Sequence, residues 1–124
     1  MRLLDTNVFV DHLRGHAPAV AFFQRLRDAR DVAFSSLTEV ELLAGKANAD
    51  RRARTTLLRF LQGWTKVDVS NPIAILAGDI ARESSLDVAD AIIAATAIQH
   101  KAEIVTKNTS DFRRIKGLRL REPY

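Results

Sequence analysis

Short apolar runs alternate with helical segments along the whole chain, and this alternation constrains the fold more than any other feature. The pattern predicts strands at residues 2–5, 32–34, 65–69 and 103–106, with an edge strand at 118–120. It predicts helices at 6–15, 18–29, 37–46, 49–63 and 71–83, a further helix from Ser84 or Ser85, and a helical turn at 108–115. Strands separated by helices are typical of a parallel sheet covered on both faces. With 124 residues, we expect one domain, 1–124.

The composition excludes several classes of protein. There is no cysteine, which excludes disulfides and thiolate metal sites and fits a reducing compartment. The most apolar stretch, residues 91–98, is far too short to span a membrane, and residues 1–5 do not resemble a signal peptide. We therefore expect a cytoplasmic protein that does not enter a membrane.

Positive charge is concentrated in two regions of the chain. Residues 101–124 carry seven Lys and Arg against three acids, which accounts for the net charge of +4. A second basic stretch runs from Arg51 to Lys66 and contains no acid. Such runs are usually solvated helix faces, but they also form surfaces that contact phosphates. Charge alone leaves both interpretations open.

Four acids lie far apart in the sequence: Asp5, Glu41, Asp90 and Asp111. Asp5 ends the first predicted strand, and Asp111 follows the strand at 103–106. Ligands bind open parallel sheets beyond the carboxyl ends of the strands, where the strand order reverses. If these two strands are neighbours there, both acids face one crevice, which the helices carrying Glu41 and Asp90 can close. Two Mg²⁺ ions held by such carboxylates would cleave phosphodiesters.

Each acid also has a simpler explanation. Asp5, Asp90 and Asp111 stand near predicted helix starts, where aspartate commonly caps backbone N–H groups, and Asp87 fits a cap at least as well as Asp90. Asp11 and Asp50 are expected to be solvated surface acids.

Glu41 is harder to explain as a structural residue. Its helical neighbours Leu37, Ala44 and Gly45 form an apolar or small face, and a buried carboxylate there needs a cation or hydrogen-bond donors. Glu39 points elsewhere, and periodicity alone does not decide which of the two glutamates faces inward.

Four segments carry a family resemblance: LLDTNVFVDHLRG, FSSLTEVELLAG, DVADAIIAATA and IVTKNTSDFRRIKGL. Together and in this order they resemble the acidic motifs of the PIN-domain ribonucleases, in particular the VapC-type toxins of bacterial toxin–antitoxin pairs. The resemblance covers nearly the whole chain. It favours Glu41 over Glu39 and Asp90 over Asp87.

The resemblance implies a three-layer α/β/α sandwich around a parallel sheet of about five strands. The implied activity is a Mg²⁺-dependent endoribonuclease, with Mn²⁺ as a possible substitute. Asp5, Glu41, Asp90 and Asp111 would be the catalytic metal ligands. Implied partners are an RNA substrate, a cognate antitoxin, and a second copy of the chain in a homodimer, with larger toxin–antitoxin assemblies that bind DNA through the antitoxin.

Neighbouring residues complete the predicted site. Thr6, Asn7 and Asn108 would support the acids or contact phosphate. Because an acidic pocket repels RNA, nearby cations are needed, and Lys107, Arg113 and Arg114 are the best candidates.

Two other functions remain open at this stage. A phosphoacceptor receiver domain would use Asp68 and Lys107, but it would need a second acid beside Asp5 and would leave Glu41 and Asp90 without a role. A PIN fold that only binds RNA or protein is the other alternative.

Overall fold

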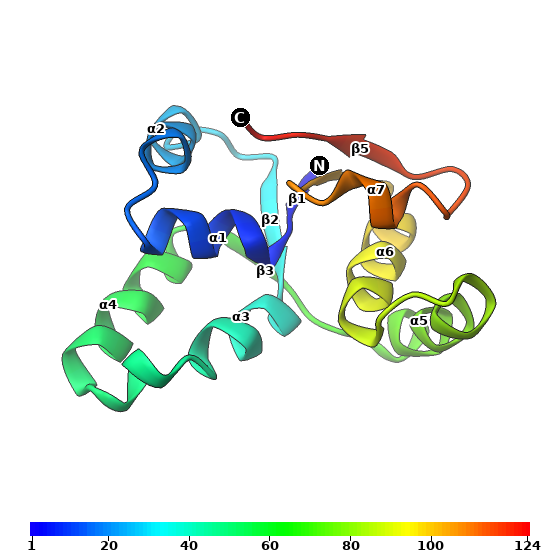
Figure 1. Ribbon diagram of the computed structural model, residues 1–124, viewed down its shortest axis with the longest axis horizontal. Helices are drawn as coiled ribbons and strands as arrows, with labels where there is room; N and C mark the ends of the chain where they lie inside the picture. The colour runs from blue at the N-terminus through cyan, green and yellow to red at the C-terminus, as the bar shows by residue number, and fades with distance from the viewer.

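The computed structural model describes all residues, 1–124, as a five-stranded sheet between two layers of helices (Figure 1). The strands are β1 (Arg2–Leu4), β2 (Val32–Ser35), β3 (Thr65–Val67), β4 (Glu103–Val105) and β5 (Arg119–Arg121). The helices are α1 (Thr6–Leu13), α2 (Ala17–Arg25), α3 (Ser36–Leu43), the 3₁₀ helix η1 (Lys46–Ala49), α4 (Arg51–Gln62), α5 (Asn71–Ser84), α6 (Val88–His100) and α7 (Thr109–Phe112). The predicted fold class is confirmed.

All neighbouring strands are parallel, in the order β3-β2-β1-β4-β5. The chain moves outward from β1 to β2 and β3, then returns to the other side of β1 to add β4 and β5. The strand order therefore reverses between β1 and β4, whose register aligns Leu4 with Val105. This is the neighbour relation on which the predicted crevice depends.

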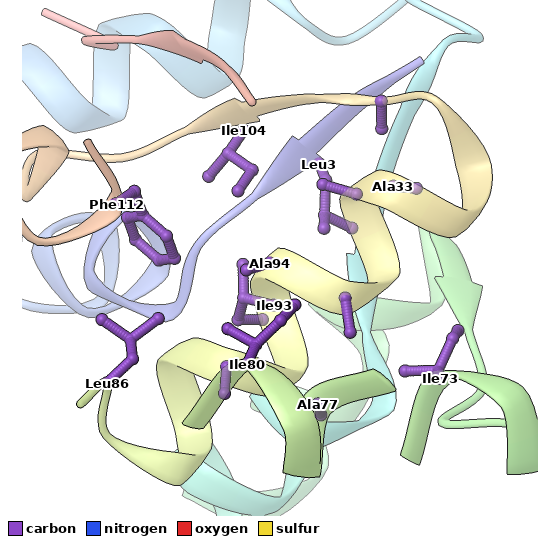
Figure 2. Packing of buried hydrophobic residues seen from close by; sticks show 14 residues of the cluster. Leu3, Ala33, Ile73, Ala77, Ile80, Leu86, Ile93, Ala94, Ile104 and Phe112 are labelled. Atoms are coloured by element: carbon purple, nitrogen blue, oxygen red, sulfur yellow. The ribbon is translucent and has the colours of Figure 1, made fainter. Parts of the chain in front are cut away.

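Alternation along the central strands divides the core in two. Leu3, Ala33 and Ile104 point to the layer formed by α5, α6 and α7, whereas the next residue of each strand points to the opposite layer. On the first side, alanines of α6 let that helix pack closely against the sheet and α5 (Figure 2). On the second side, aromatic side chains of α1, α2 and α4 fill the space, and the ring centres of Phe9 and Phe23 lie 5.2 Å apart in a tilted arrangement. Because successive residues of each buried strand point to opposite faces, both faces of the sheet are apolar and each is covered by a layer of helices.

The ends of several helices differ from the prediction. The helix predicted to start at Ser84 or Ser85 starts at Val88, because Ser84 still belongs to α5 and Ser85 ends that helix in the left-handed region, at φ 49°. The first helix stops at Leu13, before Gly15, whose φ is 76°. Asp50 is not merely a surface acid, since its carboxylate accepts a hydrogen bond from the Ala53 N–H and caps α4. No helix has both the length and the apolar character needed to cross a membrane.

Candidate metal-dependent active site

Asp5 lies at the carboxyl end of the central strand β1, at the point where the strand order reverses. It is the first residue after β1, its backbone N–H donates to the Val105 carbonyl of β4, and its side chain is almost completely buried. It is also the N-cap of α1, because its Oδ1 accepts a hydrogen bond of 2.8 Å from the Thr6 N–H. The capping interpretation is therefore correct for Asp5, but it accounts for only one of the two carboxylate oxygens.

The second oxygen of Asp5 is held by β4. Thr106, fully buried at the end of β4, donates from its hydroxyl to Asp5 Oδ2 at 2.9 Å. Burial raises the pKa of Asp5 and the charge of Glu41 raises it further, while the bonds from Thr106 and Thr6 oppose this rise. The start of α1 and the residue after β4 thus fix the orientation of one carboxylate, as a metal ligand requires.

Glu41 is linked to Asp5 through Thr6, whose hydroxyl donates to Glu41 and whose backbone N–H donates to Asp5. The Thr6 hydroxyl donates to Glu41 Oε1 at 2.7 Å and lies 2.9 Å from the hydroxyl of Thr38, which is fully buried one turn earlier in α3. Glu39 instead pairs with Lys66 on β3 at 3.1 Å, so Glu41 is the glutamate directed at the site. The expected burial of Glu41 is wrong: the residue is exposed, because the side of α3 that carries it lies at the open rim of the sheet edge.

Asp90 lies in the first turn of α6 and makes no capping bond to the backbone. Asp87 occupies the N-cap position, but its side chain makes no cap bond either. Burial, together with the negative charges of Asp5, Asp87, Asp111 and Glu41, raises the pKa of Asp90 from 3.8 to about 6. This repulsion shows that acids from four separate segments of the chain act on one location.

Asp111 lies within α7 and is bonded to a side chain, not to the helix backbone. Asn108 Nδ2 donates to Asp111 Oδ2 at 2.6 Å, and the Asn108 N–H in turn donates to the Thr106 hydroxyl at 3.0 Å. Asn7 joins the same network, since its Nδ2 donates to Thr106 at 3.1 Å. Thr106 therefore links the positions of Asp5 and Asp111.

The four acids suit a hard divalent cation by their chemistry. They supply only carboxylate oxygens, the ligands that Mg²⁺ prefers, and their mutual repulsion is what a cation would relieve. Their side chains do not themselves close into a group of three that could hold a metal ion, since Glu41 and Asp111 are bonded instead to Thr6 and Asn108. The shared metal site therefore stays a prediction.

The three cations predicted to contact RNA are close in sequence to Asp111, but two of them are exposed and the third is already in an ion pair. Arg113 and Arg114 are exposed directly after α7, and Arg114 makes one long hydrogen bond of 3.4 Å to the Ser85 carbonyl. Lys107 forms an ion pair of 2.8 Å with Asp11 on α1. The expectation that Asp11 is a solvated surface acid is wrong, because it also accepts a hydrogen bond of 2.7 Å from the Tyr124 hydroxyl.

Sequence reasoning missed three residues that connect the site: Thr38, Thr106 and Tyr124. Thr38 carried a usable signal, because it stands three residues before Glu41 and so shares its helix face. Thr106 could have been found because it directly follows β4, just as Asp5 directly follows β1. Tyr124 carried no local signal, since its contacts with Asp11 span 113 positions.

The sequence and the fold of the chain are similar to those of known proteins. The PIN domain family matches residues 2–118. Ribonuclease VapC19 of Mycobacterium tuberculosis is 36% identical over 118 residues, covering 90% of this chain and 92% of that protein. A toxin–antitoxin complex from Klebsiella pneumoniae superposes with a TM-score of 0.80 at 31% identity, covering 100% of this chain and 98% of that one. VapBC2 from Rickettsia felis, bound to a DNA fragment from its promoter, superposes with a TM-score of 0.82 at 26% identity, covering 98% and 97%.

The chain therefore belongs to the PIN domain family, and the resemblance drawn from its four acidic motifs is confirmed. The receiver-domain alternative does not fit the structure. Its acceptor would stand on a middle strand, but Asp68 follows the edge strand β3, and Lys107 is paired with Asp11.

Proposed function

We propose that this protein is a divalent-metal-dependent endoribonuclease that acts as the toxin of a toxin–antitoxin pair. The observation that carries the proposal is that the charges of Asp5, Glu41 and Asp111 raise the pKa of Asp90, near the point where the strand order reverses. Membership of the PIN domain family and the similarity to ribonuclease VapC19 support RNA as the substrate. The cytoplasm, where RNA is made and used, is the compartment that this activity requires.

Asp5, Asp90, Asp111 and Glu41 would hold the metal, Mg²⁺ or Mn²⁺. Bound there, it would supply Lewis-acid stabilisation of the phosphate and acidification of water. The protein's own groups prepare the site: Thr106 and the Thr6 N–H orient the two oxygens of Asp5, and Asn108 orients Asp111. The Thr6 hydroxyl holds Glu41 at the rim, where RNA arrives. Exposed Arg113 and Arg114 would offset the repulsion between the acids and the approaching phosphates.

The test is metal-dependent cleavage by purified Asp5→Asn. We expect the variant to fold normally, because asparagine retains the size and the capping oxygen of aspartate, and to lose cleavage in Mg²⁺ or Mn²⁺. Asp79→Asn is the matched control, since Asp79 lies on the exposed side of α5 in an ion pair with Arg82. Cleavage at the wild-type rate by Asp5→Asn would refute the assigned site.

A non-catalytic PIN-fold binding module is the second candidate. It is favoured by one observation, namely that the acids do not close into a ready-made group of metal ligands. A calorimetric Mn²⁺ titration separates the two candidates, because the nuclease must bind the ion and lose that binding in Asp5→Asn.

Two kinds of protein partner follow from the same proposal. The solved relatives include toxin–antitoxin complexes, so we infer a cognate antitoxin for this chain, with DNA bound through the antitoxin in larger assemblies. The second partner is another copy of the chain in a homodimer, for which Val40 on α3, an apolar side chain that is 63% exposed, is a candidate contact. Sedimentation of wild type and Val40→Glu would test the dimer.

A further inference from the structure

The loop between β4 and α7, residues 106–108, makes hydrogen bonds to three residues at the start of α1 or along it. Thr106 bonds to Asp5, the Lys107 N–H donates to Asn7 Oδ1 at 3.4 Å, and Lys107 Nζ pairs with Asp11 Oδ2 at 2.8 Å. The first two attachments belong to the acidic site described above. The third lies outside that site, and its function is not explained by metal or RNA binding.

The carboxylate of Asp11 is shared between two donors from distant parts of the chain. Its Oδ2 accepts from Lys107 Nζ at 2.8 Å and from the Tyr124 hydroxyl at 2.7 Å. These donors hold the pKa of Asp11 below its usual value, so the carboxylate stays ionised at neutral pH. The Lys107–Asp11 pair is itself partly exposed, with 45% of the Lys107 and 20% of the Asp11 side chain accessible, so the second bond, from Tyr124, is what adds to the modest contribution of such a pair.

Tyr124 is itself fixed by packing. Its ring lies 5.8 Å from the rings of Phe22 and His16 at α2, and the ammonium of Lys107 lies 5.7 Å from its centre, within the range of a cation–π contact. Tyr124 therefore contacts both Asp11 and Lys107, and its ring packs against α2. The three residues connect α1, the loop after β4 and the segment after β5.

We propose that Asp11, Lys107 and Tyr124 form a latch that positions the catalytic loop, so that Lys107 acts as a positioning residue and not as an RNA contact. The two residues that flank Lys107 in the loop hold catalytic acids, because Thr106 orients Asp5 and Asn108 orients Asp111. The position of Lys107 therefore affects both acids. If the loop were released from α1, it would become more mobile, and Asp5 and Asp111 would spend less time in the arrangement that binds metal. The proposal deepens the proposed function, since it assigns a role in the same site.

The two roles of Lys107 predict opposite effects of one substitution. If Lys107 contacts RNA, Asp11→Asn removes a competing carboxylate, and RNA binding stays the same or tightens. If the latch positions the acids, Asp11→Asn weakens metal binding by about tenfold, the usual cost of losing a group that orients metal ligands. Lys107→Met should have the same effect, Lys107→Arg should retain most of the affinity, and the double variant Asp11→Asn/Lys107→Met should be no worse than either single change.

The experiment measures Mn²⁺ affinity by calorimetry and amide hydrogen exchange at residues 106–112, together with kcat and KM for RNA. Asp31→Asn is the matched control, because Asp31 likewise accepts two hydrogen bonds, both from Arg2, but lies at the amino ends of the central strands, away from the acids. We expect weaker Mn²⁺ affinity and several-fold faster exchange in Asp11→Asn and, to a smaller extent, in Tyr124→Phe, with neither change in the control. Tyr124→Phe keeps the ring and its packing, so it tests the latch even if Asp11→Asn does not fold.

Wild-type exchange at the amides of Lys107 and Asn108 in both latch variants would overturn the proposal, as would unchanged Mn²⁺ affinity with tighter RNA binding. If the wild type binds no Mn²⁺ and cleaves no RNA, the proposed function fails, whereas the exchange data still decide whether the latch holds the loop.

Discussion

Replacing Asp90 with asparagine should stabilise the metal-free protein, although it removes a proposed metal ligand. Asp90 is partly buried and is repelled by Asp5, Asp87, Asp111 and Glu41, which together with burial raises its pKa from 3.8 to about 6. Because the folded protein holds this proton more tightly than the unfolded chain, stability falls as the pH rises from about 4 to 6 and stays low above that range. Asparagine is neutral at every pH and should escape this loss.

The magnitude follows from the change in pKa. Each pH unit corresponds to about 1.4 kcal/mol, so the rise to about 6 sets an upper limit of about 3 kcal/mol. Asp90 is partly exposed and solvent screens its charge, which reduces the expected gain in unfolding free energy to about 1 kcal/mol. At this size of domain, that gain raises the melting temperature by about 4 °C.

Urea unfolding in EDTA at pH 8 and pH 5 tests this prediction. The gain should be complete at pH 8 and about half as large at pH 5, which lies in the middle of the range over which the wild type loses stability. Added Mn²⁺ should reverse the order at pH 8, because it stabilises only proteins that bind it. Asp79→Asn should show none of these changes. A destabilised Asp90→Asn at pH 8 without metal, or an equal gain at both pH values, would refute the electrostatic reasoning.

Three other predictions concern RNA binding, a helix end and the core. Arg113→Ala should reduce the slope of log affinity for single-stranded RNA against log salt concentration by about 0.7, because it removes one phosphate contact. The control Arg82→Ala should leave the slope unchanged, because Arg82 is already paired with Asp79 and Glu83. Ser85→Gly should raise the unfolding free energy by about 0.5–1 kcal/mol in urea, because glycine adopts a φ of 49° without steric cost; no gain would argue against a left-handed helix end. Phe112→Ala should lower the unfolding free energy by about 3–5 kcal/mol, since this fully buried ring packs between α7 and the sheet, and a loss under 1 kcal/mol would contradict that packing.

The helices and strands were largely predictable because their signals are local. Alternating strands and helices indicated the parallel sheet, and Asn71-Pro72 marked the start of α5. Helix ends were less predictable, since Ser85 looks like the start of the next helix in sequence but ends the previous one in a backbone conformation that no local pattern indicates. Helix-capping preferences left Asp87 and Asp90 competing, the motif resemblance favoured Asp90, and the structure adds that the charges of the other acids act on Asp90.

The sequence alone determined the alternation of elements, the acidic motifs and the family to which they belong, because these depend on residue type and spacing along the chain. Tertiary structure alone decided which side chains orient the acids and which charges are already paired. Thr106 meets Asp5 across 101 positions, and Asp11 meets Lys107 across 96. Such contacts arise when parallel strands bring distant segments to one edge of a sheet, and sequence separation carries no information about that distance in space.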